Sequence, residues 1–257
     1  TLSSSSAASD VYKRQINRFA KTMKSNVKRI PMDNKIGIDL DRIAESVGRR
    51  TKLIYLCNPN NPTGSIMGTD QLESFCKTMS KKSIVFVDEA YHEYVTDPNY
   101  RSMIDLVKKG HNVIVSRTAS KVHGLAGLRV GFAITTPEIA KRLESYLTDS
   151  LNVIGLRAAI ASYQDERFQA HSIEQNNRAK KIVTNHLDNK GIEYLDSQTN
   201  FIFIKTGMNI EEFQPAMEKN GVIVGRPFPP YNKWCRLSMA KPEEMENFNT
   251  GMDRVLG

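Results

Sequence analysis

The chain has 257 residues, of which 40% are hydrophobic and 25% are charged, and its formal net charge is +8. This composition is that of a globular protein with one large domain, or a large and a smaller one. No apolar run is long enough to span a bilayer, and the basic residues are scattered without an aromatic-basic block. We therefore expect anionic small molecules as partners, and neither a membrane nor nucleic acid.

The cysteines and histidines give no sign of a disulfide framework or a metal site. The three cysteines, Cys57, Cys76 and Cys235, are odd in number and form no CxxC pair. The five histidines have no metal-ligand spacing, so we expect no bound metal. This cysteine usage fits a reducing compartment, and we expect the protein to be cytoplasmic.

The N-terminal segment differs in composition from the rest of the chain. Residues 1–9 read TLSSSSAAS, which is polar and of low complexity, and they lack the apolar region of a secretory signal. We expect residues 1–15 to be a non-native or disordered leader outside the fold.

The first half of the chain predicts an α/β domain. Short continuous apolar runs predict strands at residues 53–57, 84–87 and 113–115, buried on both faces of a parallel sheet. Helical periodicity lies between them at 70–81 and 102–109, and another strand is expected at 129–135. The alternation indicates a three-layer αβα domain with a mostly parallel sheet, which we assign to residues 16–160.

The second half begins with helices and then changes rhythm. Helical patterns run from Pro137 through Leu147, from 152 to 163 and from 166 to 189. Beyond Gly191, the expected elements are strands at 201–204, 222–224 and 234–239, and helices at 210–219 and 242–256. We assign residues 161–257 to a smaller C-terminal α+β domain.

Polar motifs follow the first three predicted strands. NPNNPTG occupies 58–64, DEAY occupies 88–91 and SRTASK occupies 116–121. Ligands of open α/β sheets collect outside the carboxyl ends of the strands, so these motifs would converge on one crevice. Taken singly, each also has a structural explanation, such as a turn for NPNNPTG and a helix cap for DEAY.

Taken together and in this order, the motifs resemble those of the fold-type I pyridoxal-phosphate (PLP) aminotransferases of class I/II. The resemblance is greatest to the histidinol-phosphate aminotransferase branch and extends from about Ile16 to the C-terminus. Its further motifs are GLAGLRVGF (124–132), QTNFIF (198–203) and WCRLSMAKPEEM (234–245). Members of that family carry roughly a further quarter of chain upstream, so we expect this chain to be N-terminally truncated.

The resemblance implies a cofactor site for PLP. Lys121 would form a Schiff base with the cofactor and shuttle a proton, with Arg117 as a candidate cationic neighbour. Asp88 would pair with the pyridine nitrogen, and Asn61 and Tyr91 would hydrogen-bond the phenolic oxygen. The other cofactor-binding residues implied are Thr118, Ser120 and Arg129, which would form the phosphate cup, with Arg129 also a candidate neighbour of Lys121. A cis bond between Asn61 and Pro62 is also implied.

The resemblance also implies a substrate site and an activity. Arg236 would bind the substrate α-carboxylate, Arg226 would bind a distal phosphate, and Asn200 would lie near the carboxylate, although it could equally cap a strand. The activity would be amino transfer between an amino acid, histidinol-phosphate-like in one reading, and a 2-oxo acid, in a homodimer. The alternatives are a PLP-dependent decarboxylase or lyase, and an inactive truncated homologue.

Overall fold

The chain divides into two compact units in a computed structural model that describes residues 5–9, 14–147 and 151–257. The first unit runs to Gln164, apart from Asn61–Ser65, which belongs with Asp165–Gly257 in the second unit. Residues 1–4 and 10–13 of the expected leader lie outside the described residues.

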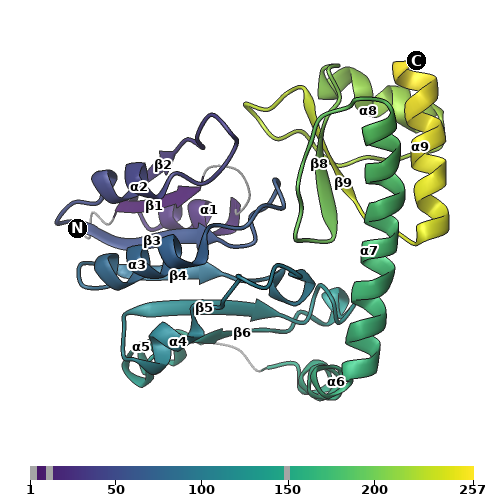
Figure 1. Cartoon of the computed structure of the whole chain (residues 1–257). Coiled ribbons are helices and arrows are strands. Elements are labelled where there is room, and N and C mark those ends of the chain that lie inside the picture. The colour runs from purple at the N-terminus through teal and green to yellow at the C-terminus, as the bar shows by residue number, and fades with distance from the viewer. Residues whose placement is uncertain (1–4, 10–13, 148–150) are drawn as a thin grey trace. The chain divides into compact units, whose positions relative to one another are not determined.

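A six-stranded sheet forms the centre of the first unit, in the order β2-β1-β3-β4-β5-β6 (Figure 1). The strands are β1 (Ser5–Ser9), β2 (Asn26–Ile30), β3 (Thr51–Cys57), β4 (Ile84–Asp88), β5 (Val113–Thr118) and β6 (Gly131–Ile134). All neighbours pair in parallel except β6, which is antiparallel to β5. The expected mostly parallel sheet is confirmed, with one antiparallel edge.

Strand β1 corrects the expectation that residues 1–15 form a leader outside the fold. Ser5–Ser9 pairs in parallel with both β2 and β3. Strand pairing uses backbone N–H and C=O groups, which a low-complexity Ser/Ala sequence supplies as well as any other. Helix α1 (Arg14–Thr22) likewise begins within the last two residues of that segment.

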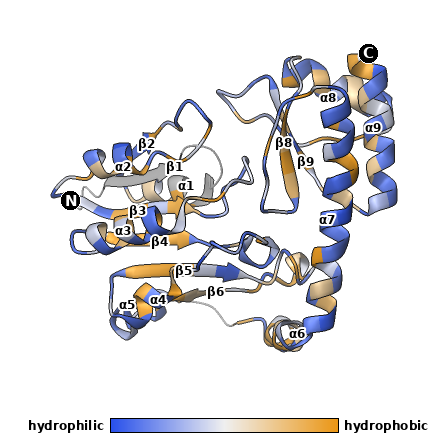
Figure 2. Cartoon of the chain, in the orientation of Figure 1, coloured by the Kyte–Doolittle hydropathy of each residue, from blue (hydrophilic) through white to orange (hydrophobic). Residues whose placement is uncertain are grey.

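Helices cover both faces of the sheet because successive side chains of each strand alternate between the two faces. Helices α2 (Leu40–Ser46), α3 (Thr69–Met79) and α4 (Ile104–Lys108) share a hydrophobic core with Ile54 of β3, Val85 of β4 and Val113 of β5. On the other face, Tyr55 and Cys57 pack with Phe86 and with Ile16 of α1. Figure 2 shows the apolar character of β3, β4 and β5, whose burial on both faces explains their continuous apolar runs.

The first unit ends with α5 (Pro137–Glu144) and α6 (Val153–Gln164). Pro137 lies in the first turn of α5, as its fixed φ favours. The unit extends to Gln164, four residues beyond the expected boundary, because the end of α6 is tied to His123. Ser162 Oγ lies 2.9 Å from His123 Nδ1, and the Tyr163 ring centroid lies 3.9 Å from that of His123.

The second unit is an α+β fold around a three-stranded antiparallel sheet. Its strands are β7 (Tyr194–Leu195), β8 (Phe201–Lys205) and β9 (Trp234–Ser238), and its helices are α7 (Glu166–Asn189), α8 (Ile210–Lys219) and α9 (Pro242–Leu256). Asp165 caps α7 by accepting a hydrogen bond from the Phe168 amide. Helices α7 and α9 lie side by side (Figure 1), and both contribute to the core that covers the sheet.

The strand expected at residues 222–224 is wrong. Val222 N donates to Met217 O at the end of α8, and the following residues run without ladder hydrogen bonds. Val224 is buried while Ile223 is 86% exposed, so the apolar run lies against the core by alternate residues only. Gly225 lies so close to β9 that a β carbon there would meet Arg236 O at 2.6 Å.

Among the described residues, no helix is long and apolar enough to cross a membrane.

Candidate active site

Asp88 lies at the carboxyl end of β4 and is 1% exposed. Tyr55 OH donates to its Oδ2 at 2.7 Å, and Ser116 Oγ donates to its Oδ1 at 2.9 Å. Burial raises the pKa of Tyr55 well above its usual value, as do the nearby Cys57 and Asp88, so the phenol remains a donor. Both carboxylate oxygens therefore have a donor, which a buried carboxylate needs.

Lys121 follows the neighbouring strand, β5, and lies close to Tyr91. Its Nζ is 5.1 Å from the centroid of the Tyr91 ring, which is 2% exposed, whereas Lys121 itself is half-buried. In the parallel register of β4 and β5, Asp88 pairs with Ser116. The structure thus brings the three predicted catalytic residues to the same ends of two adjacent strands.

The three residues predicted to bind the phosphate lie on two linked segments of the first unit, with Thr118 and Ser120 at the end of β5 and Arg129 before β6. Thr118 Oγ1 donates to Ser120 Oγ at 2.9 Å, and Ser120 N donates to Thr118 Oγ1 at 3.1 Å. Ala119 N donates to Val130 O, which ties this turn to the residue after Arg129. Arg129 is exposed, donates to Ala126 O at 2.9 Å and has a left-handed backbone with φ of 56°. Hydroxyls, backbone amides and a guanidinium are the donors that suit a phosphate dianion.

Arg117, which we expected to act as a cationic neighbour of Lys121, is bound to Glu89 instead. Its Nη2 lies 2.8 Å from Glu89 Oε2, and its Nη1 lies 3.7 Å from Glu93 Oε1. Glu89 also accepts from Ser102 Oγ at 2.7 Å and from Met103 N at 2.8 Å. Strand alternation explains this outcome, since Arg117 and Glu89 point to the face opposite Ser116 and Asp88.

The charges around this ion pair shift the pKa values of its neighbours. Burial raises the pKa of Glu89 and of Glu93, against the opposing influence of Arg117. Burial, aided by Arg117, lowers the pKa of His92 to about 4. His92 is therefore neutral at physiological pH.

In the second unit, Asn61 and Arg236 contact each other. Arg236 Nη1 donates to Asn61 Oδ1 at 2.9 Å, and its guanidinium carbon lies 5.1 Å from the Phe201 ring and 5.2 Å from the Phe228 ring. Arg236 is half-buried, and its Nε is buried without a hydrogen-bond partner among the described residues. The Arg236 guanidinium is therefore partly withdrawn from solvent and packed against two aromatic rings.

Arg226 and Asn200 also lie in the second unit. The guanidinium carbon of Arg226 lies 4.1 Å from the Phe228 ring, on which Arg236 also stacks, and its Nη1 donates to Pro227 O. Asn200 accepts a backbone hydrogen bond from Met239 N at the end of β9. The expected cis bond between Asn61 and Pro62 is confirmed.

Tyr55 and Ser116 are the site residues that sequence reasoning missed. The available signal was the buried strand at 53–57, because a tyrosine in such a strand must find a partner for its hydroxyl.

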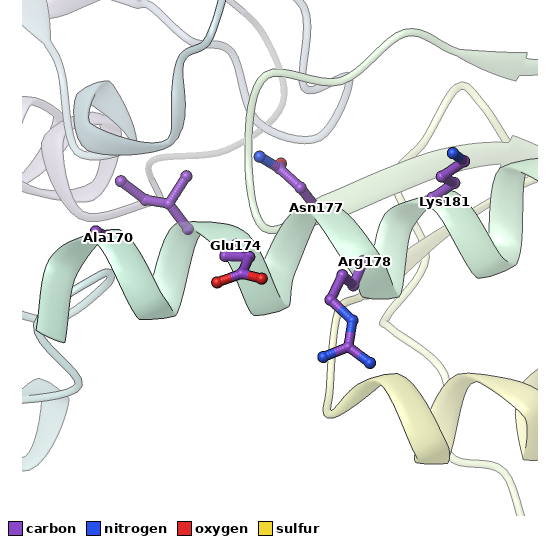
Figure 3. A pocket seen from close by; sticks show the side chains of 6 residues that line it. Ala170, Glu174, Asn177, Arg178 and Lys181 are labelled. Carbon is purple, nitrogen blue, oxygen red and sulfur yellow. The ribbon is translucent and has the colours of Figure 1, made fainter. Parts of the chain in front are cut away.

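A separate hollow lies along α7 alone, lined by Ala170, Ile173, Glu174, Asn177, Arg178 and Lys181 (Figure 3). It contains none of the predicted site residues.

A mostly parallel sheet covered by helices on both faces is the fold of the PLP-dependent transferases. The lysine, the carboxylate and the hydroxyls at adjoining strand ends fit the cofactor site of that class. The sequence profile of aminotransferase class I and II matches residues 8–250. The chain belongs to that family.

Individual relatives agree with this family. The chain is 34% identical to histidinol-phosphate aminotransferase 2 of Hydrogenovibrio crunogenus, over 86% of this chain and 60% of that protein. It matches histidinol-phosphate aminotransferase 2 of Haemophilus influenzae strain Rd at 35% identity, over 92% of this chain and 65% of that protein. The chain thus spans less than two thirds of the length of these curated relatives.

Solved structures agree as well. A protein of Erwinia carotovora atroseptica, assigned as a histidinol-phosphate aminotransferase, superposes with a TM-score of 0.94 at 31% identity, over 99% of this chain and 75% of that one. The histidinol-phosphate aminotransferase of Sinorhizobium meliloti, solved in complex with pyridoxal-5'-phosphate, gives 0.88 at 25% identity, over 98% and 70%.

Proposed function

We propose that this chain carries the PLP site of an aminotransferase, with Lys121 as the residue that bonds covalently to the cofactor. The observation that carries the proposal is the grouping of Lys121 beside the Tyr91 ring, with Asp88 at the adjoining strand end. The donor set fits PLP, because it offers an amine for the aldehyde, a buried carboxylate for a cationic ring nitrogen, and hydroxyls with a guanidinium for a phosphate.

Each residue has one task in this proposal. Asp88 accepts a hydrogen bond from the ring nitrogen, and Tyr91 and Asn61 donate to the phenolic oxygen. The remaining cofactor-binding residues, Thr118, Ser120 and Arg129, hold the phosphate. When bound, PLP supplies an electron sink for the substrate's Cα electrons. The Lys121 amine would take a proton from the substrate's Cα and return it to C4′ of the cofactor, which requires the amine to be neutral before the transfer.

We also propose how the substrate is bound. Arg236 pairs with a substrate carboxylate through its planar fork, and its buried Nε, which lacks a partner among the described residues, supports this role. Arg226 binds a distal phosphate, and Asn200 lies near the carboxylate. The names of the relatives suggest histidinol phosphate as one substrate. A 2-oxo acid is the other substrate in this proposal.

We propose a cytoplasmic homodimer as the working form. Support comes from large apolar side chains exposed at the end of α5 and along α6, among them Tyr146 at 82%, Val153 at 66% and Ile154 at 78%. Several large apolar side chains exposed within a short stretch of the chain are typical of an interface with another chain. The three cysteines are buried and form no disulfide within the part of the chain that the structure describes, which suits a reducing compartment. Light scattering of the wild type and Ile154→Glu tests the dimer, and a monomeric wild type would refute it.

Cofactor binding and a half-reaction test the activity. We expect PLP to give a visible absorbance band with the wild type, and Lys121→Ala to abolish it. L-glutamate should bleach that band and yield 2-oxoglutarate. Release of CO₂ without 2-oxoglutarate would indicate a decarboxylase instead, and the absence of any band in the wild type would refute a functional site in this chain.

A further inference from the structure

Three adjacent parallel strands place a short hydrogen-bonded row on one face of the sheet. Tyr55 lies on β3, Asp88 on β4 and Ser116 on β5, and the register pairs Asp88 with Cys57 on one side and with Ser116 on the other. The period of two puts all three side chains on the same face. The Tyr55 hydroxyl reaches one carboxylate oxygen of Asp88, and the Ser116 hydroxyl reaches the other.

This arrangement fixes a torsion that is otherwise soft. The last torsion of an aspartate joins an sp³ to an sp² carbon and has broad wells, so the carboxylate plane can rotate. Two donors on different strands, one to each oxygen, hold that plane in a single orientation. Tyr55 is 2% exposed and its ring centroid lies 5.6 Å from that of Phe86, so the hydroxyl position is itself held by packing.

The two donors also take the place of water around the buried Asp88 carboxylate. A buried polar group without hydrogen bonds costs free energy, and the two hydroxyls compensate for the lost water. Because the pKa of Tyr55 is raised well above its usual value, the phenol keeps its proton and remains a donor at neutral pH.

We propose that Tyr55 and Ser116 are positioning residues that orient Asp88 for the nitrogen of a pyridine-type cofactor. This inference rests on the proposed function, since it assumes that PLP binds and that Asp88 meets its ring nitrogen. Neither hydroxyl touches the cofactor in this proposal; both act through the carboxylate. Removing either one should weaken the interaction of the site with the ring nitrogen and leave the other cofactor contacts intact.

The test compares PLP with its 1-deaza analogue, in which carbon replaces the ring nitrogen. The variants are Tyr55→Phe, which keeps the ring and its packing, and Ser116→Ala. Tyr194→Phe is the matched control, because it also removes a tyrosine hydroxyl that donates to a carboxylate, that of Asp188 at 3.0 Å. Dissociation constants are measured by absorbance titration, and thermal melts check that each variant folds.

We expect Tyr55→Phe to weaken PLP binding roughly tenfold, which is typical of the loss of one hydrogen bond to a charged group. Ser116→Ala should act in the same direction, and the control should not change the affinity. The deaza analogue should bind the wild type and Tyr55→Phe equally well. An equal loss for both ligands, or no loss for either, would overturn the inference while leaving PLP binding by the wild type intact. A wild type that binds no PLP would instead refute the proposed function.

Discussion

Replacing Arg117 by methionine should destabilise the first unit strongly, because it removes one partner of a buried ion pair. The Glu89 side chain is 1% exposed and that of Arg117 is 10% exposed. Breaking a buried pair from one side leaves an uncompensated charge and costs about 3–5 kcal/mol. Adding Glu89→Gln removes that charge, so the double variant should recover a large part of the loss.

The same reasoning predicts how the loss depends on pH. Burial raises the pKa of Glu89, and without Arg117 the strongest opposing influence is gone, so the pKa rises further. A carboxyl whose folded-state pKa is raised stabilises the fold below its unfolded pKa and loses that contribution as pH rises through the folded value. Glu93 faces Arg117 and shifts the same way, while His92 is neutral above about pH 4. The deficit of Arg117→Met should therefore be smaller at pH 5 than at pH 8.

Urea unfolding of the wild type, both single variants and the double variant at pH 5 and pH 8 measures these quantities. Arg117→Lys is the conservative control, because it keeps the positive charge and loses only the planar fork. If the two substitutions add without coupling, or if the loss is the same at both pH values, the buried pair does not stabilise the unit in the way argued.

Three further variants test other parts of the structure. Gly64→Ala should lower the free energy of unfolding by roughly 2–3 kcal/mol, because its β carbon would meet Ser197 Oγ at 2.2 Å and its φ is +77°, and urea denaturation checks this. His92→Gln should flatten the fall in stability between about pH 6.5 and pH 4 by on the order of 2 kcal/mol, since the wild-type imidazole is half-buried and has a pKa of about 4; an unchanged pH profile would contradict this. Arg129→Gly should raise the melting temperature, because it relieves about 1 kcal/mol of left-handed strain, and should weaken PLP binding. A melting temperature and a PLP affinity that rise together or fall together would contradict this prediction.

The central strands were predictable because burial on both faces leaves a pattern that needs no tertiary information. The runs at 53–57, 84–87 and 113–115 all correspond to strands, since each is too short for a helix and apolar throughout. The run at 222–224 has the same composition and is not a strand, because no backbone segment among residues 5–9, 14–147 and 151–257 pairs with it as a strand. β1 is the converse case, since its sequence is polar and yet its backbone pairs with both β2 and β3. Composition reports burial, whereas pairing is decided elsewhere in the chain.

The candidate site was likewise predictable only in part from the sequence. Motif order predicted which residues would meet at the strand ends, and Asp88, Tyr91 and Lys121 lie there. The partners that hold them were not predictable, because Tyr55 is 33 residues from Asp88 in the sequence and belongs to no motif. Arg117 was assigned to the wrong neighbour because its position within a motif says nothing about which face of the sheet it points to.

Arg129 connects the stability of the fold with its function. A non-glycine residue at positive φ costs free energy that a glycine would not, and Arg129 bonds locally to Ala126 O while its side chain remains exposed. That local contact does not require an arginine, so it does not explain why an arginine occupies a strained backbone position. Strain of this kind persists where a side chain is needed for function. The conformation of Arg129 therefore supports the proposal that its side chain binds an anionic ligand, since Ala119 N donates to Val130 O and so links the residue after Arg129 to the turn that Thr118 and Ser120 share.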